Sequence, residues 1–386
     1  MMGRKHFIPW YPPAETHIDL ADILQAFIAP SGNLNASLCR YLGVANCVSA
    51  QSGRALLALL LQALWQRDGG RLDEVLIPGY TCYSVAAAVA RSGLKIAVYD
   101  LDPRTMDPDI DSVKKAFGKR TLAVIGQHLF GIPAHLGEIL AFARQEGVCF
   151  IEDAAQGLGG SQSGVLLGTF GDFGLFSFGR GKPLPLGCGA SMIGNDQAIL
   201  DEISIRATSN GLFKLFETAV IQALSSSYLY GIMETLPLGL GKTDFNPDFP
   251  MAGLPEVIHR LGEKAINSLE RLNAQRRKIA HIYSAMLPAD RTIPISDDDR
   301  PVFTRYPVMA GAGDIPKNLR RMGVRRMYPQ AIIDESSMGI YMVHDYQATP
   351  GARELAGKLI TLPTHARITS DLARTISMQT KEVFQW

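Results

Sequence analysis

The sequence predicts an α/β fold built on a mostly parallel sheet, and three observations support this prediction. Short, fully apolar runs alternate with helix-like segments between about residues 45 and 195. These runs lack polar alternation, which is typical of strands buried on both faces of a parallel sheet. Each run ends at a polar residue, a glycine or a proline. After about residue 200 the pattern changes, which indicates a second, smaller part of the molecule.

The expected elements follow one another in strand–helix order. Strands are expected at 75–77, 96–99, 122–125 and 149–151, with helices at 84–91, 110–117 and 136–145. Residues 256–287 carry leucine and isoleucine at helical spacing and predict one long connecting helix. Residues 300–386 predict a small α+β lobe, with strands at 303–309 and 359–363. In parallel sheets of this kind, ligands bind beyond the carboxyl ends of the strands.

Composition excludes several classes of function. The 386 residues carry a formal net charge of +1, so no basic field indicates a nucleic-acid partner or an anionic membrane. The apolar stretch 218–233 is interrupted by Gln222 and three serines and is too short for a membrane span. The five cysteines lack metal-binding spacing and fit a reducing compartment. Residues 1–13 lack the apolar core of a signal peptide, so a cytoplasmic location without metal is expected.

Two residues beyond expected strands carry the strongest chemical signal. Asp153 closes the segment that follows the strand at 149–151, and Lys182 ends the run Phe176–Lys182. A lysine amine forms a Schiff base with the aldehyde of pyridoxal phosphate, and a carboxylate keeps the pyridine nitrogen protonated so that the ring accepts electrons. The plain alternatives are a surface lysine after a glycine-rich turn and an aspartate at a helix N-cap.

Several motifs surround these two residues in a fixed order along the chain. They are Val48–Gly53, Ile77–Thr81, Val98–Asp102, Gln127–Gly131, Ile151–Gln156, Gly171–Asp172, Phe176–Lys182, Gly187–Gly189 and Leu362–His365. Together they resemble the DegT/DnrJ/EryC1/StrS family of pyridoxal-phosphate enzymes, which are best known as nucleotide-sugar aminotransferases. The resemblance is dense from residue 45 to 196 and thinner beyond.

This resemblance implies an aspartate-aminotransferase-like fold, called fold type I. Residues 1–255 would form the large pyridoxal-phosphate-binding domain, and residues 256–386 the connecting helix and a small C-terminal domain. It also implies a homodimer with shared active sites. The expected reaction moves an amino group from an amino-acid donor, with glutamate as first candidate, to a nucleotide-linked keto-sugar. The alternatives are a non-nucleotide keto substrate, a dehydratase and a regulatory homologue. Lys182 argues against the dehydratase, because those relatives carry histidine there.

The resemblance also assigns roles to individual residues. Lys182 would move the proton between the substrate Cα and the cofactor C4′. Asp153 would bind the pyridine nitrogen, and Gln156 the ring hydroxyl. Ser52 and Gly53 precede an expected helix whose N-terminal N–H groups favour an anion, so the cofactor phosphate is expected there. The hydroxyl of Ser177 would bind the same phosphate.

Several positions depart from the family pattern. Many relatives carry threonine where this chain has Arg54, which would contact the phosphate, a substrate anion or solvent. An aromatic residue usually stacks on the ring at the position of Cys82, so either Cys82 covers the ring or Tyr80 or Tyr83 reaches in. An Asn-Tyr-Arg segment is replaced by residues 246–251, where Asn246 would substitute in the contact with the neighbouring subunit, unless that contact is lost. His128 would position substrate or serve as a structural histidine.

The apolar stretch 205–245 is expected to form a helical insert that covers the dimer or the active-site entrance. Its part from 212 to 240 places apolar residues at i, i+3 and i+4 spacing. Ordinary core burial is the plain alternative, and binding to a membrane surface through the same face is a further one.

Overall fold

The computed structural model describes residues 10–15, 18, 20–29, 31–208, 244–328, 330–344 and 348–386, together with five single positions between 208 and 244 (211, 216, 220, 230 and 231). The expected insert over 205–245 therefore lies almost entirely outside the described residues, and its role stays a prediction. Within the described part, no helix is both long and apolar enough to cross a membrane.

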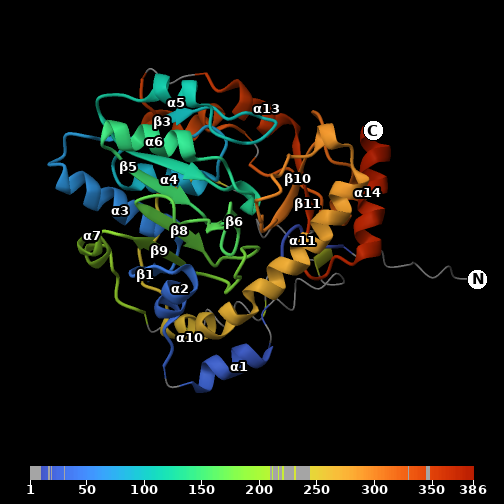
Figure 1. Cartoon of the computed structure of the whole chain (residues 1–386), viewed down its shortest axis with the longest axis horizontal. Coiled ribbons are helices and arrows are strands. Elements are labelled where there is room, and N and C mark those ends of the chain that lie inside the picture. The colour runs from blue at the N-terminus through green and yellow to red at the C-terminus, as the bar shows by residue number, and fades with distance from the viewer. Residues whose placement is uncertain are drawn as a thin grey trace, which may run out of the picture.

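A seven-stranded sheet forms the centre of the molecule, in the order β1-β9-β8-β5-β4-β2-β3 (Figure 1). The pairs from β8 through β5, β4 and β2 to β3 are parallel, whereas β9 is antiparallel to both β1 and β8. The predicted α/β class with a mostly parallel sheet is confirmed. The strands are β1 Cys47–Ala50, β2 Glu74–Pro78, β3 Lys95–Tyr99, β4 Thr121–Gln127, β5 Cys149–Asp153, β8 Phe173–Ser177 and β9 Ala190–Gly194.

Both faces of the sheet are buried, because successive side chains of each strand enter different apolar clusters. Val124 and Phe150 pack on the face covered by α6 and α11, while their neighbours Ile125 and Ile151 pack on the face covered by α3 and α4. This two-sided burial explains why the strands read as continuous apolar runs. The covering helices are α3 Gly53–Arg67, α4 Tyr83–Arg91, α6 Gly137–Glu146 and α11 Leu269–Met286.

The other elements surround this layered centre. The remaining described α-helices are α1 Leu20–Ile28, α2 Leu34–Leu42, α5 Ile110–Ala116, α7 Gln197–Glu202, α10 Glu256–Ala265, α12 Lys317–Arg321, α13 Pro350–Lys358 and α14 Ser370–Phe384. Two-stranded sheets pair β6 Ser161–Gln162 with β7 Val165–Leu166, and β10 Arg305–Met309 with β11 Leu359–Pro363. Short 3₁₀ turns are η1 Leu129–Gly131, η2 Ile266–Ser268, η3 Ala289–Arg291, η4 Ile332–Asp334 and η5 Ser336–Tyr341.

The prediction of one long connecting helix over 256–287 was wrong in one respect. The structure has two α-helices, α10 and α11, joined by the 3₁₀ turn η2. The turn contains Asn267 and Ser268, whose side chains compete for backbone hydrogen bonds and so weaken a helix interior. The two helices run in succession from beneath the sheet toward the C-terminal part (Figure 1).

The C-terminal elements share an apolar core with the sheet. Val308 of β10 and Leu362 of β11 belong to the same cluster as Val124 of the central strand β4 and Ile376 of α14. Helices α11 and α14 lie side by side in this region (Figure 1). The division of the chain into domains at residues 255 and 256 stays a prediction.

Candidate functional site

The carboxyl ends of six strands meet at one edge of the sheet. Strand β9 is antiparallel to both β1 and β8, so β1 runs parallel to β8 and ends at the same edge. Ser52 follows β1, Gln127 ends β4, Asp153 ends β5 and Ser177 ends β8. This is the edge at which α/β sheets bind ligands.

Asp153 presents a carboxylate that lies deep in this edge. Its Oδ1 accepts the Ala155 backbone N–H at 3.0 Å, and no other hydrogen bond to the carboxylate comes from the described residues. Burial raises the pKa of Asp153, while the Ala155 N–H and the positive charge of Lys182 oppose that shift. Asp153 and Lys182 are thus close enough to interact electrostatically, and one carboxylate oxygen is left to accept a further donor.

Lys182 lies in a tight loop that follows β8. The loop begins where Phe178 N–H donates to the Gly189 carbonyl at 2.8 Å, and Lys182 N–H donates to Gly179 O at 3.2 Å. The buried guanidinium of Arg276 then holds the Lys182 carbonyl at 3.2 Å and that of the following proline at 3.1 Å. Burial lowers the pKa of Arg276 to about 10. The backbone of the lysine is therefore fixed from two sides.

Gln156 lies one turn beyond Asp153 with both ends of its amide engaged. Its Oε1 accepts the Thr304 hydroxyl at 2.9 Å, and its Nε2 donates to the Tyr328 hydroxyl at 3.3 Å. Each amide end retains one further hydrogen-bonding position. The predicted bond from Gln156 to the cofactor hydroxyl stays a prediction, and the amide has the capacity for it.

The predicted phosphate site lies at the start of α3. Ser52 is the N-cap of this helix, and its side chain accepts a first-turn backbone N–H at 3.4 Å. The N–H of Gly53 meets no backbone acceptor among the described residues. Ser177 shares a sheet face with Leu175, which packs against Gly53, and no described residue bonds to the Ser177 hydroxyl. These donors suit an anion at a helix N-terminus.

Arg54 lies beside this turn and packs on an aromatic ring. Its guanidinium carbon lies 4.6 Å from the ring centroid of Phe249, which is buried. Burial lowers the pKa of Arg54. The sequence left open whether Arg54 contacts the phosphate, a substrate anion or solvent. An Arg54 side chain that points freely into solvent does not match this packing. A contact of Arg54 with phosphate or substrate stays a prediction.

The segment that replaces the Asn-Tyr-Arg motif leads into residues that pair with the predicted phosphate turn of the same chain. Gln51 N–H donates to Ala252 O at 2.9 Å. Asn246 accepts the Asp248 N–H at 2.8 Å, and Asp248 lies 3.7 Å from Arg91, on the exposed surface. The contact of Asn246 with a neighbouring subunit stays a prediction.

Two of the three candidates for covering the cofactor ring form hydrogen bonds with backbone carbonyls of the C-terminal part. Tyr80 donates its hydroxyl to Met327 O at 2.7 Å, and Tyr83 donates to Gln330 O at 3.3 Å. Both rings are buried. Cys82, the half-buried N-cap residue of α4, is the candidate that keeps accessible surface. The assignment of Cys82 or Tyr83 to the ring stays a prediction.

His128 has both ring nitrogens engaged by protein groups. Nδ1 accepts the Ala134 N–H at 3.0 Å, so the neutral ring donates from Nε2 to the Glu152 carboxylate at 2.8 Å. Glu152 is fully buried and also accepts the Phe170 N–H at 2.7 Å. This geometry matches the structural alternative for His128 and leaves no ring nitrogen for a substrate.

Comparison with known proteins decides the family. The model of the "DegT/DnrJ/EryC1/StrS aminotransferase family" matches residues 30–230, more than half of the chain. The chain belongs to this family. The matched part contains every candidate cofactor residue named above, whereas Asn246 lies outside it.

Several curated relatives are named as aminotransferases of keto or dehydro substrates. The chain is 36% identical over 183 residues to a UDP-N-acetyl-3-dehydro-alpha-D-glucosamine 3-aminotransferase of Acidithiobacillus ferrooxidans, covering 47% of this chain and 49% of that protein. It is 32% identical over 247 residues to an L-glutamine:2-deoxy-scyllo-inosose aminotransferase of Streptomyces kanamyceticus, covering 64% and 53%. The chain thus spans about half the length of both. A dTDP-4-dehydro-2,3,6-trideoxy-D-glucose 4-aminotransferase of Saccharopolyspora spinosa is 27% identical, covering 89% and 86%.

Solved structures of other proteins share the fold. The Helicobacter pylori aminotransferase PseC, involved in the biosynthesis of pseudoaminic acid, superimposes with a TM-score of 0.76 at 15% identity, covering 97% of this chain and 99% of that one. The E. coli GDP-4-keto-6-deoxy-D-mannose-3-dehydratase with bound hydrated PLP gives a TM-score of 0.73 at 18% identity, covering 96% and 99%. The predicted fold type I architecture is confirmed.

The residues at the sheet edge fit the cofactor of this family. A protonated pyridine nitrogen would supply a charged donor for the Asp153 carboxylate oxygen that accepts no hydrogen bond from the described residues. A phosphate would occupy the N-terminus of α3, where Gly53 N–H and the Ser177 hydroxyl have no acceptor among the described residues. The donor set therefore matches both ends of pyridoxal phosphate.

Sequence reasoning missed three residues that surround these groups, namely Arg276, Thr304 and Tyr328. Thr304 and Tyr328 contact Gln156 across 148 and 172 positions of the chain. Arg276 reaches the Lys182 loop across 94 positions. No local motif marks these residues, because each comes from a C-terminal element that only the folded chain brings to the site.

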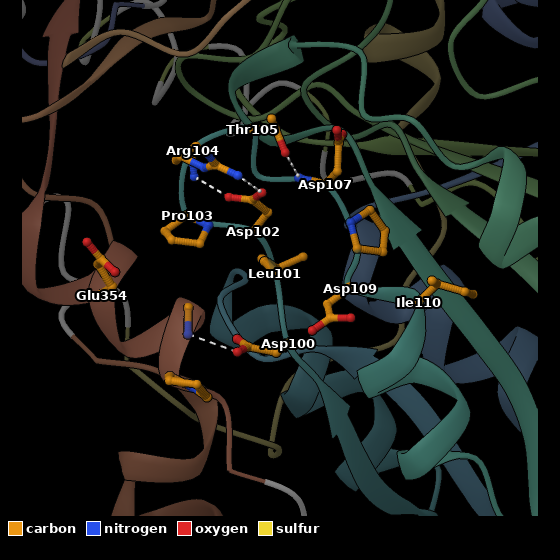
Figure 2. A pocket seen from close by; sticks show the side chains of 13 residues that line it. Asp100, Leu101, Asp102, Pro103, Arg104, Thr105, Asp107, Asp109, Ile110 and Glu354 are labelled. Carbon is orange, nitrogen blue, oxygen red and sulfur yellow. Dashed lines mark hydrogen bonds and ion pairs between the residues drawn. The ribbon is translucent and has the colours of Figure 1, made fainter. Parts of the chain in front are cut away.

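A separate cavity of about 880 Å³ lies beyond β3 and is distinct from this site. Figure 2 shows its acidic lining, with Asp100 turned toward the start of α13. The Asp100 carboxylate accepts the N–H groups of Gly351 at 2.8 Å and Ala352 at 2.7 Å, and Asp102 pairs with Arg104. These acidic groups are engaged in capping and pairing. No group of three or more His, Cys, Asp or Glu side chains in the described part of the chain is arranged to hold a metal ion.

Proposed function

We propose that this protein is a pyridoxal-phosphate-dependent aminotransferase that moves an amino group from an amino-acid donor to a keto-sugar linked to a nucleotide. Glutamate is the first candidate for the donor. The observation that carries the proposal is the half-buried Asp153 carboxylate beside Lys182, with one oxygen free of described donors, at the ligand-binding edge of the sheet. A homodimer and a cytoplasmic location belong to the same proposal.

The bound cofactor would supply an electron sink that stabilises negative charge at the substrate Cα. Asp153 would accept a hydrogen bond from the protonated pyridine nitrogen, and the Lys182 amine would take the proton from the substrate Cα and deliver it to the cofactor C4′. Ser52, Gly53 and Ser177 would bind the phosphate. Arg276 would hold the Lys182 backbone, so that the amine approaches from a fixed loop.

The acceptor class has one alternative that a specific finding favours. Four relatives are named for 2-deoxy-scyllo-inosose, a cyclic ketone without a nucleotide, and for glutamine as donor. A dehydratase is disfavoured by Lys182, and nothing in the described residues favours a regulatory role.

A half-transamination experiment tests the proposed activity. The purified protein is loaded with pyridoxal phosphate and mixed with glutamate or glutamine, and the cofactor spectrum is followed. We expect conversion to the pyridoxamine form with at least one donor and no conversion with Lys182→Ala. UDP- and dTDP-linked keto-sugars and 2-deoxy-scyllo-inosose are then offered to the converted protein. Absence of cofactor uptake, or uptake without conversion by any amino acid, would contradict the proposal.

A further inference from the structure

Tyr328 joins the candidate site from the C-terminal part of the chain. Its side chain is buried, and its ring packs edge-on against Tyr80 with the centroids 5.4 Å apart. Its hydroxyl accepts the Gln156 amide N–H at 3.3 Å. Burial raises the pKa of the Tyr328 phenol well above its ordinary value, and the nearby Asp153 carboxylate raises it further. Tyr328 therefore stays neutral and lies beside the predicted partners of the cofactor ring.

The backbone of Tyr328 has a conformation that its residue type rarely adopts. Its φ is +43°, in the left-handed region, although it precedes a proline in the sequence. The flanking carbonyls are held in place, that of Met327 by the Tyr80 hydroxyl and that of Gln330 by the Tyr83 hydroxyl. Strain of this kind persists where the surrounding structure imposes it, and it concentrates at functional sites.

The hydrogen bonds of the Tyr328 hydroxyl leave one donor unassigned. A phenol has a single proton and can also accept. Because the Gln156 amide donates to the oxygen, the Tyr328 proton is directed elsewhere. No described residue accepts it. The titratable groups near Tyr328 include Asp153, Cys82, Tyr80 and Arg305, and none of them forms a hydrogen bond with its hydroxyl.

We propose that Tyr328 is a further ligand-binding residue of this site, whose hydroxyl donates its proton to an anionic oxygen of the bound molecules while its oxygen orients Gln156. This inference rests on the proposed function. Two oxygens have the required chemistry: the ring oxygen of the cofactor and a carboxylate oxygen of the amino donor. Sequence position alone gives no reason to place Tyr328 here, since it lies 172 residues from Gln156.

The test compares Tyr328→Phe with the wild type and with Tyr80→Phe. The first variant removes one oxygen from the site. The control removes a hydroxyl that holds the same loop at Met327 O without touching Gln156. Thermal unfolding of each protein confirms that the fold is kept. The dissociation constant of pyridoxal phosphate, the position of its visible absorption band, and kcat and KM for the amino donor are then measured.

If the cofactor ring oxygen is the acceptor, Tyr328→Phe shifts the band and raises the dissociation constant about threefold to tenfold, as expected for one lost hydrogen bond. If the carboxylate is the acceptor, the band stays and KM for the donor rises by a similar factor with kcat kept. Unchanged values in Tyr328→Phe, or the same changes in Tyr80→Phe, overturn the inference. A wild type that takes up no cofactor refutes the proposed function instead.

Discussion

At the scale of residues, the site divides into groups that a local pattern reveals and groups that only the fold assembles. Asp153 and Lys182 were predictable because each follows an apolar strand, and strand ends of a parallel sheet meet at one edge. The structural role of His128 could not be predicted, because its tautomer depends on hydrogen bonds with Ala134 and Glu152. No pattern in the sequence marks these two partners. Tyr328 was missed because its left-handed backbone has no signature in the sequence.

The first prediction concerns Asp153→Asn. Burial raises the pKa of Asp153, so the cofactor-free native state holds a proton that the unfolded chain releases near its ordinary pKa of about 3.9. The stability from this group is therefore present below that value and is lost as the pH rises through the raised native pKa. Thermal unfolding without cofactor should show Asp153→Asn gaining on the wild type between about pH 4 and pH 7.

The same variant should lose at least about a hundredfold in kcat for amino transfer, because the ring nitrogen would lack its counter-charge. A variant that is more stable at pH 7 yet inactive would separate the two effects. Near-normal turnover would remove Asp153 from the mechanism.

The second prediction places the covalent attachment of the cofactor. The Lys182 amine lies close enough to Asp153 to affect its pKa, and its backbone is held by Arg276. Incubation with pyridoxal phosphate, reduction with borohydride and peptide mapping should locate the adduct on Lys182. Lys182→Arg keeps the charge and should give no adduct there. A wild-type adduct that maps mainly to another lysine would refute the assignment.

At the scale of elements, the strands were easier to predict than their directions and partners. The four strands β2 to β5 follow the apolar runs, because burial on both faces leaves a clear pattern. The antiparallel course of β9 has no such mark, since its five residues read like any short buried strand. The break between α10 and α11 depends on a single tightened turn.

The lysine loop illustrates how elements distant in sequence support the site. Residues 10–15 pass between the C-terminal part and this loop: Tyr11 N–H donates to Arg321 O at 2.7 Å, and His365 contacts Pro12 O at 2.9 Å. Ala14 then lies against Gly181, where an added Cβ would come within 2.6 Å of the Ala14 Cβ. The N-terminal segment therefore closes over the loop that bears Lys182.

The third prediction uses this close contact. Gly181 has a φ of +75°, so Gly181→Ala adds backbone strain of about 1 kcal/mol and also a collision with Ala14. Gly164→Ala is the matched control, because its φ is +84° and nothing lies within 4 Å of an added Cβ. Denaturant unfolding should show a larger loss of stability for Gly181→Ala. Its affinity for pyridoxal phosphate should also fall, while the control keeps the wild-type affinity. Equal effects would mean that the N-terminal segment does not hold the loop.

At the scale of the whole molecule, the sheet and the C-terminal elements form one apolar core, in which Val124 of β4 and Ile376 of α14 belong to the same cluster. The sequence predicted a change of pattern after residue 200, but a core shared by distant segments cannot be read from local periodicity. The relation between subunits is likewise beyond a single chain, because shared active sites depend on surfaces that only a second copy completes.

The last prediction concerns the apolar stretch 212–240, which lies almost wholly outside the described residues. The sequence places Leu212, Leu215, Phe216 and Val220 at helical spacing, with charged Lys214 and Glu217 near the start. Such a pattern predicts an amphipathic insert that covers the dimer or the site entrance, and no basic cluster beside it favours anionic lipid. Sedimentation at several concentrations should show a dimer, and flotation with anionic lipid vesicles should leave the protein in the unbound fraction. Replacing Leu215 and Phe216 by serine should weaken the dimer if the insert covers the interface, and should leave it unchanged if the insert covers only the entrance. Strong flotation of the wild type, abolished by the same replacement, would instead establish a membrane-surface role and favour an acceptor carried on a lipid.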